Sequence, residues 1–83
     1  MVEILGQKEM IGEFIEEYLE APFIPEDSFA ELGLDSLGVV ELIMEIEQHF
    51  DIEIPDRLAE KCETFGELVN LAESIYDDRR KDA

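Results

Sequence analysis

Three segments of this chain repeat apolar residues at the spacing of an α-helix, and this periodicity constrains its fold most. The first segment, about Val2–Glu20, is apolar on one side and acidic on the other. The second covers about Ser36–Phe50. The third opens on Thr64-Phe65-Gly66-Glu67, whose S/T-x-x-E form predicts a capping box. The pattern predicts an all-α bundle with three principal helices. The apolar residues of the outer two segments are Ile4, Met10, Ile11, Phe14, Ile15, Tyr18 and Leu19, and Phe65, Leu68, Val69, Ala72, Ile75 and Tyr76.

The connections between these helices are expected to be structured. Residues 21–35 form a long first loop with apolar side chains that should hold it on the core, namely Phe23, Ile24, Phe29, Leu32 and Leu34. Ile52-Glu53-Ile54-Pro55 predicts an extended connection, and a short helix over Arg57–Cys62, capped by Asp56, should follow it. The polar tail Asp77–Ala83 is expected to be frayed.

The composition bounds the class of function. Eighty-three residues suit one small domain over 1–83. The net charge of −17 disfavours nucleic acids and anionic membranes, and it favours partners with basic patches. The one cysteine, Cys62, excludes an internal disulfide, and no calcium-loop motif is present, so no metal site is expected. Without a leader, or an apolar run near ~20 residues, we expect a monomeric cytoplasmic protein.

The second helix carries two apolar stripes, although one is enough for folding. On a helical wheel with Ser36 at zero, the core stripe lies between about 240° and 340°. It consists of Val39, Leu42, Ile43, Ile46 and Phe50. A second group lies between about 40° and 100°, with carboxylates beside it. This group consists of Leu37, Val40 and Met44, and its neighbours include Glu41 and Glu47. Either the long loop covers this group, or it is an exposed surface for a partner.

Ser36 at the start of this helix has three interpretations. It could be a simple first-turn serine behind an Asp35 N-cap. A hydrolase nucleophile would need a base, but the only histidine, His49, lies about 20 Å along the helix axis and about 140° around it. No G-x-S-x-G elbow is present either. The third interpretation, covalent attachment by another enzyme, needs only an exposed hydroxyl and a recognisable surface beside it.

The residues around Ser36 resemble the attachment site of an acyl carrier protein. The resemblance includes Glu31-Leu32-Gly33-Leu34-Asp35-Ser36-Leu37 and Val40-Glu41-Leu42, and it extends through Asp56 to Thr64. It implies an acyl-carrier-type four-helix bundle, with one short helix, that is not itself an enzyme. Ser36 would carry 4′-phosphopantetheine, transferred from coenzyme A, and acyl groups would be held on it as thioesters. The chain would shuttle these groups between enzymes of fatty-acid or polyketide biosynthesis.

The resemblance also implies a docking surface and a set of partners. Six residues match positions used in docking, namely Asp35, Leu37, Val40, Glu41, Met44 and Glu47. The partners would be a phosphopantetheinyl transferase and acyl-processing enzymes with basic patches, such as a ketosynthase and an acyltransferase. Gly38 departs from the family pattern, because many fatty-acid carriers have an acid there, and this weakens an assignment to housekeeping fatty-acid synthesis. Two alternatives stay open, a carrier of aminoacyl or peptidyl groups and an unmodified acidic adaptor that binds basic partners.

Overall fold

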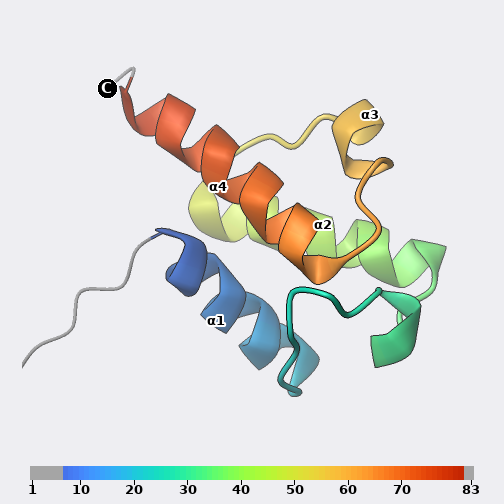
Figure 1. Ribbon diagram of the computed structural model, residues 1–83. Coiled ribbons are helices and arrows are strands. Elements are labelled where there is room, and N and C mark those ends of the chain that lie inside the picture. The colour runs from blue at the N-terminus through green and yellow to red at the C-terminus, as the bar shows by residue number, and fades with distance from the viewer. Residues whose placement is uncertain (1–6, 82–83) are drawn as a thin grey trace, which may run out of the picture.

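The computed structural model describes residues 7–81 as a bundle of helices (Figure 1). α1 contacts both α4 and α2, and α3 contacts α4. The predicted all-α class, with three principal helices and one short one, is confirmed for the described residues. The elements are α1 (Gln7–Leu19), the 3₁₀ turn η1 (Ala30–Leu32), α2 (Ser36–Phe50), α3 (Asp56–Ala59) and α4 (Phe65–Lys81). Nowhere in 7–81 is a helix both long enough and apolar enough to span a membrane.

The predicted helix bounds are correct for α2 and need adjustment elsewhere. α2 begins and ends at the residues that the periodicity predicts. α1 ends at Leu19, and the predicted start of this helix, with Val2 and Ile4, lies outside the described residues. α4 runs through Lys81, so it includes most of the segment that was expected to fray. Fraying of that segment stays a prediction.

The short helix differs from its prediction in both range and cap. α3 spans Asp56–Ala59 instead of Arg57–Cys62. Its N-cap is Pro55, with no side-chain cap bond, so the prediction that Asp56 is the cap was wrong. The Pro55 carbonyl accepts hydrogen bonds from two backbone N–H groups of α3, each at 3.0 Å. The helix therefore starts earlier than expected, and Asp56 lies in its first turn.

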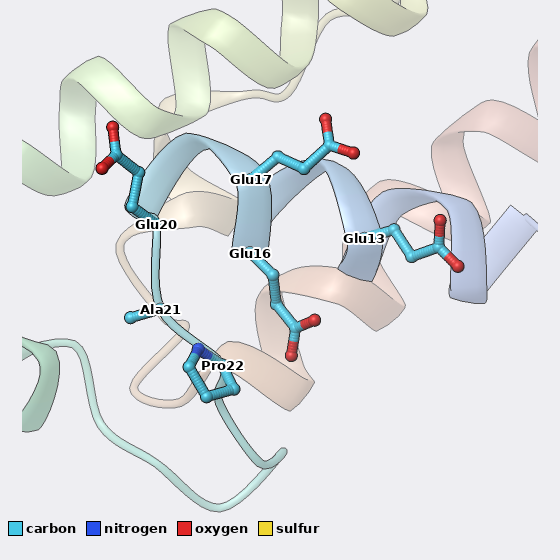
Figure 2. Close-up of a pocket in the computed structure, with 6 residues that line it drawn as sticks. All are labelled: Glu13, Glu16, Glu17, Glu20, Ala21 and Pro22. Atoms are coloured by element: carbon cyan, nitrogen blue, oxygen red, sulfur yellow. The ribbon is translucent and has the colours of Figure 1, made fainter.

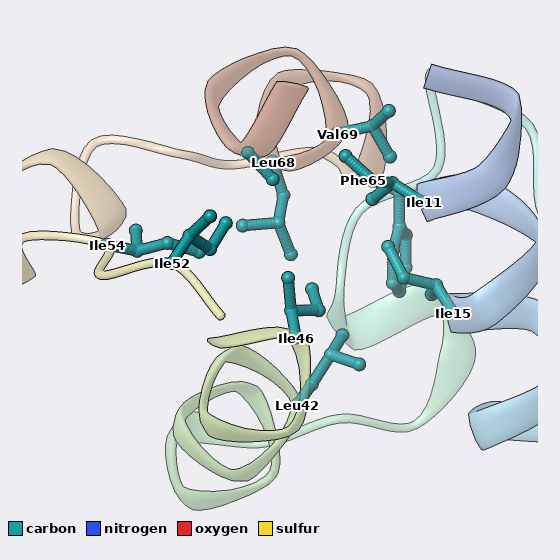
Figure 3. Packing of buried hydrophobic residues seen from close by; sticks show 10 residues of the cluster. Ile11, Ile15, Leu42, Ile46, Ile52, Ile54, Phe65, Leu68 and Val69 are labelled. Carbon is teal, nitrogen blue, oxygen red and sulfur yellow. The ribbon is translucent and has the colours of Figure 1, made fainter. Parts of the chain in front are cut away.

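The core consists of apolar side chains from the three long helices and from the α2–α3 connection (Figure 3). Ile52 and Ile54 both reach it from that connection while Glu53 stays exposed, because alternate residues of an extended chain point the same way. Among the described residues, no polar or charged side chain is buried. The buried residues are Ile11, Ile15, Leu42, Ile46, Ile52, Ile54, Phe65, Leu68, Val69 and Ala72.

Aromatic packing holds the first loop on the core, as predicted, with one exception. The ring centroids of Phe23 and Phe29 lie 4.8 Å and 4.9 Å from that of Phe65, one stacked and one edge-on. The two leucines of the loop also pack against the core. The prediction for Ile24 was wrong, since its side chain is 58% exposed. Neighbouring residues of an extended segment point to opposite sides. Because the Phe23 side chain points toward the core, that of Ile24 points to solvent.

The same loop is bonded to the first turn of α4 through the backbone. The Phe65 N–H donates to the carbonyl of Asp27, and the Gly66 N–H donates to that of Pro25, both at 3.0 Å. The first four N–H groups of a helix have no partner within the helix. The loop therefore satisfies two of these groups in α4 and is fixed to the helix by them.

The capping box predicted at the start of α4 is present. The Glu67 N–H donates to Thr64 Oγ1, and the Thr64 N–H donates to Glu67 Oε1, each at 3.2 Å. A second pair of the same kind lies in the first loop, where the Glu31 N–H donates to Ser28 Oγ at 3.3 Å and the Ser28 N–H donates to Glu31 Oε1 at 2.7 Å. The spacing Ser28-x-x-Glu31 is the same S-x-x-E pattern, so a local sequence signal for this turn exists as well.

We predict that Gly66→Ala destabilises the fold. A Cβ at Gly66 would lie 2.8 Å from Pro25 Cβ and 3.0 Å from the Pro25 carbonyl oxygen, which is closer than packed atoms allow. Overpacking of this kind costs about 1–3 kcal/mol. Urea unfolding of the variant should therefore show a lower midpoint than that of the wild-type chain.

Gly12→Ala is the matched control, because it makes the same change inside α1. A Cβ there would meet only Phe23 Cζ, at 3.9 Å, an ordinary contact. Alanine is better than glycine in a helix interior by roughly 1 kcal/mol, so this variant should be more stable than the wild-type chain. An increase in stability in both variants would contradict the tight loop–α4 contact.

Candidate functional site

Ser36 is the first residue of α2, and its side chain is exposed. Asp35 is the N-cap, as predicted, and its Oδ1 accepts the N–H of Gly38 at 2.8 Å. The Ser36 hydroxyl has no hydrogen-bond partner among residues 7–81. Capping is therefore performed by Asp35, and the serine hydroxyl is free at a fixed position on a helix end.

Two glycines shape the approach to this serine. Gly33 ends η1 with φ 83°, a left-handed conformation that glycine adopts without strain, and its N–H donates to Ala30 at 2.9 Å. At Gly38, an added Cβ would lie 3.2 Å from Leu34 Cδ2 and 3.3 Å from Asp35 Oδ1. A side chain at position 38 must therefore displace its neighbours by a few tenths of an ångström. This crowding disfavours a larger side chain at position 38.

A groove of about 500 Å³ lies beside Ser36, between α2 and α3. Apolar side chains and three carboxylates line it together with the serine hydroxyl. The sequence did not predict this groove. No local pattern shows that α3 lies across from α2, so several lining residues were interpreted only as core or surface residues. The lining residues are Phe29, Ser36, Val39, Val40, Ile43, Met44, Glu47, Asp56, Ala59, Glu60 and Cys62.

The second apolar stripe of α2 is exposed. Leu37 is 66% exposed, and Val40 and Met44 are each 50% exposed. The alternative in which the long loop covers this stripe was therefore wrong. Val40 and Met44 also line the groove, whereas Leu37 is not among the lining residues. Glu41, beside the stripe, is exposed as well. The structure thus places an uncovered apolar surface with a carboxylate at its side next to Ser36.

Among the predicted docking residues, Glu47 is the one whose side chain forms a hydrogen bond to a residue outside its own helix. It is half-buried, and its Oε2 accepts the backbone N–H of Ile54 at 2.7 Å. Ile54 belongs to the connection between α2 and α3. The sequence placed Glu47 at the edge of the second stripe, but nothing in the pattern indicated this bond.

Among residues 7–81, the structure places no histidine beside Ser36. The only histidine of the chain, His49, lies in the last turn of α2, with its ring stacked on that of Phe14 at 4.3 Å between centroids. It is exposed and peripheral, as predicted. Cys62 in the groove is half-buried, and its Sγ contacts the carbonyl of Leu58 at 3.7 Å. Burial raises the pKa of the Cys62 thiol, and the nearby Glu67 carboxylate raises this pKa further.

Two other hollows lack a serine, threonine or cysteine in their lining. One, of about 510 Å³, lies at the end of α1, where four glutamates line it together with Ala21 and Pro22 (Figure 2). The other, of about 680 Å³, follows the α2–α3 connection. In the part of the chain that the structure describes, no group of three or more His, Cys, Asp or Glu side chains is placed to hold a metal ion. The groove beside Ser36 is therefore the candidate site.

Comparison with known proteins identifies the family. Residues 8–72 match the family described as "Phosphopantetheine attachment site". An "Acyl carrier protein" from Picosynechococcus sp. (strain ATCC 27264 / PCC 7002 / PR-6) is 54% identical over 48 residues, which are 57% of this chain and 59% of that protein. The match thus spans less than two thirds of the relative. The chain belongs to the phosphopantetheine attachment family, and its cofactor is covalently attached 4′-phosphopantetheine.

Proposed function

We propose that this chain is an acyl carrier and that Ser36 is its attachment residue. The observation that carries the proposal is the free, exposed hydroxyl at the start of α2, beside a groove and an uncovered apolar stripe. The similarity to a protein named acyl carrier protein supports the acyl cargo. Fatty-acid and polyketide assembly are the pathways in which we place it. The family match disfavours the unmodified adaptor, and a carrier of aminoacyl groups stays as the alternative.

The residues at Ser36 fit a phosphodiester-linked group. The Ser36 oxygen would attack a phosphorus of the coenzyme A pyrophosphate, form the new P–O bond and release adenosine 3′,5′-bisphosphate, while the hydroxyl proton leaves to a base of the transferase. The positive end of the α2 dipole favours an anionic phosphate at this position. Asp35 keeps the helix start rigid through its cap bond to Gly38. When bound, the group supplies a thiol that holds an acyl chain as a thioester.

Catalysis would come from the partners, because no histidine lines the groove to act on the serine. The partners we propose are a phosphopantetheinyl transferase and acyl-processing enzymes, including a ketosynthase and an acyltransferase. They would contact the α2 surface through Asp35, Leu37, Val40, Glu41, Met44 and Glu47. The exposed stripe would provide the apolar contact, and the carboxylates would attract basic patches. A monomeric, cytoplasmic carrier suits this role and stays a prediction.

We predict that incubation with coenzyme A, magnesium and a broad-specificity transferase adds one phosphopantetheine group to the chain. Intact-mass measurement should show a single addition to the wild-type protein and none to Ser36→Ala. Ser74→Ala, an exposed serine in α4, is the control and should be loaded like the wild type. An addition that survives Ser36→Ala would refute the assignment of this residue.

We predict that Glu41→Lys slows loading by the transferase roughly tenfold at low salt, because charges at the edge of an interface act mainly on association. Glu17→Lys is the matched control, since it changes the net charge equally from an exposed position on α1. Both variants should keep their melting temperature within a few degrees, as surface changes usually do. Equal kcat/KM values for the two variants would contradict a docking surface on α2.

We predict that Met44→Ala weakens partner binding more than it weakens the fold. Half of the Met44 side chain is exposed, so its truncation leaves little internal space, whereas Ile46 on the core side of the same helix is fully buried. Ile46→Ala should lower the free energy of unfolding by about 2–5 kcal/mol. Binding titrations and urea melts of both variants separate the two stripes. A larger stability loss in Met44→Ala than in Ile46→Ala would place the methionine in the core.

A further inference from the structure

Glu47 lies where the groove beside Ser36 meets the α2–α3 connection. Its side chain lines both the groove and the hollow that follows the connection. The bond from the Ile54 N–H to Glu47 Oε2, at 2.7 Å, lies at the short end of the range for N–H···O bonds, as expected of a carboxylate acceptor. Ile54 itself is buried, with 4% of its surface exposed. The bond therefore fixes an anchored segment directly to the helix that forms one wall of the groove.

The same arrangement, which we call a joint, occurs a second time away from the groove: a glutamate near the end of a helix accepts the backbone N–H of the residue seven positions later. Glu16 in α1 accepts the N–H of Phe23 at 3.2 Å, and in both joints the acceptor and donor residues are seven positions apart. Each of the two helices is followed directly by a non-glycine residue with positive φ, Glu20 at 58° and Asp51 at 57°. A glutamate one turn inside the helix thus fixes the segment that leaves it. Only the joint in α2 borders the groove.

The opposite wall of the groove is held from the α4 side, because α3 contacts α4 and because Ala59 and Cys62 pack against the core. α3 has four residues, none of them buried, and a helix of that length has no stability of its own. The wall continues through Glu60 to Cys62, beyond the end of α3. The bond from Ile54 to Glu47 joins α2 to the segment that leads into this wall.

We infer that Glu47 is a positioning residue that acts as a latch on the groove: bonded to the Ile54 N–H it holds the α3 wall against α2, and its release opens the groove. The functional meaning of the groove rests on the proposed function, but the latch does not. A partner's basic side chain that takes the Oε2 atom of Glu47 would displace the Ile54 N–H, so docking at that oxygen and opening of the groove are linked. Glu47 differs in this from Glu41, whose exposed carboxylate has no structural partner among the described residues.

The native Cys62 provides the test, because it is the only cysteine and it lines the groove. The rate of alkylation of Cys62 by iodoacetamide is measured on the full apo-chain, with intact mass confirming that no phosphopantetheine is attached. Glu47→Gln keeps an acceptor at the same reach and loses the charge. Glu47→Asp keeps the charge and shortens the side chain by about 1.5 Å, so it cannot reach Ile54. We expect Glu47→Asp to be alkylated roughly fivefold faster than Glu47→Gln, which should stay near the wild type.

Glu16→Asp controls for a general loss of stability, since it shortens the equivalent glutamate away from the groove. It should leave the alkylation rate at the wild-type value, and exchange of the Ile54 amide should rise only in Glu47→Asp. Equal alkylation in Glu47→Asp and Glu47→Gln, or an equal rise in Glu16→Asp, overturns the latch. Loading of the wild-type chain with phosphopantetheine is measured separately. Failure to load would refute the proposed function and leave the latch result standing.

Discussion

The pairing of the first loop with the start of α4 is the interaction on which the rest of the structure depends. Two loop carbonyls, those of Pro25 and Asp27, accept the N–H groups of Gly66 and Phe65. The two segments are far apart in the chain, so this contact closes a long stretch that includes all of α2. It also places Phe65 where both loop phenylalanines can pack on it. The loop is thereby fixed before it reaches the serine, and the start of α2 is positioned as a consequence.

α2 divides its apolar residues between a buried stripe and an exposed one. Leu42 and Ile46 point into the core, while Leu37 and Met44 are left uncovered on another side. Carboxylates elsewhere in the chain have an internal use as well, because four glutamates accept backbone N–H groups at turns and connections. These are Glu16, Glu31, Glu47 and Glu67. Part of the acidic excess therefore orders the connections between helices, and the remainder is available to attract basic partners.

Local patterns predicted the helices, the core stripe, the Asp35 cap and the capping box of α4, because each depends on residues within a few turns. The same patterns failed where the answer depends on distant segments. The outward position of Ile24 follows from Phe23 packing on Phe65, far along the chain. The start of α3 was missed for a local reason, because Pro55 and not Asp56 is its N-cap. The groove was not predicted, since its walls come from α2 and α3 and no spacing in the sequence relates them. The bond of Glu47 was missed for the same reason.

The chemistry of Cys62 has a consequence for any thioester held beside it. A thiolate at this position would be a competing acceptor, able to take an acyl group from the carrier and leave it stranded on the protein. Because burial and Glu67 raise the pKa of the Cys62 thiol, it stays protonated at neutral pH and is a weak nucleophile. A raised thiol pKa therefore makes Cys62 a poor acceptor for a thioester held in the groove, so the cysteine is compatible with the proposed function.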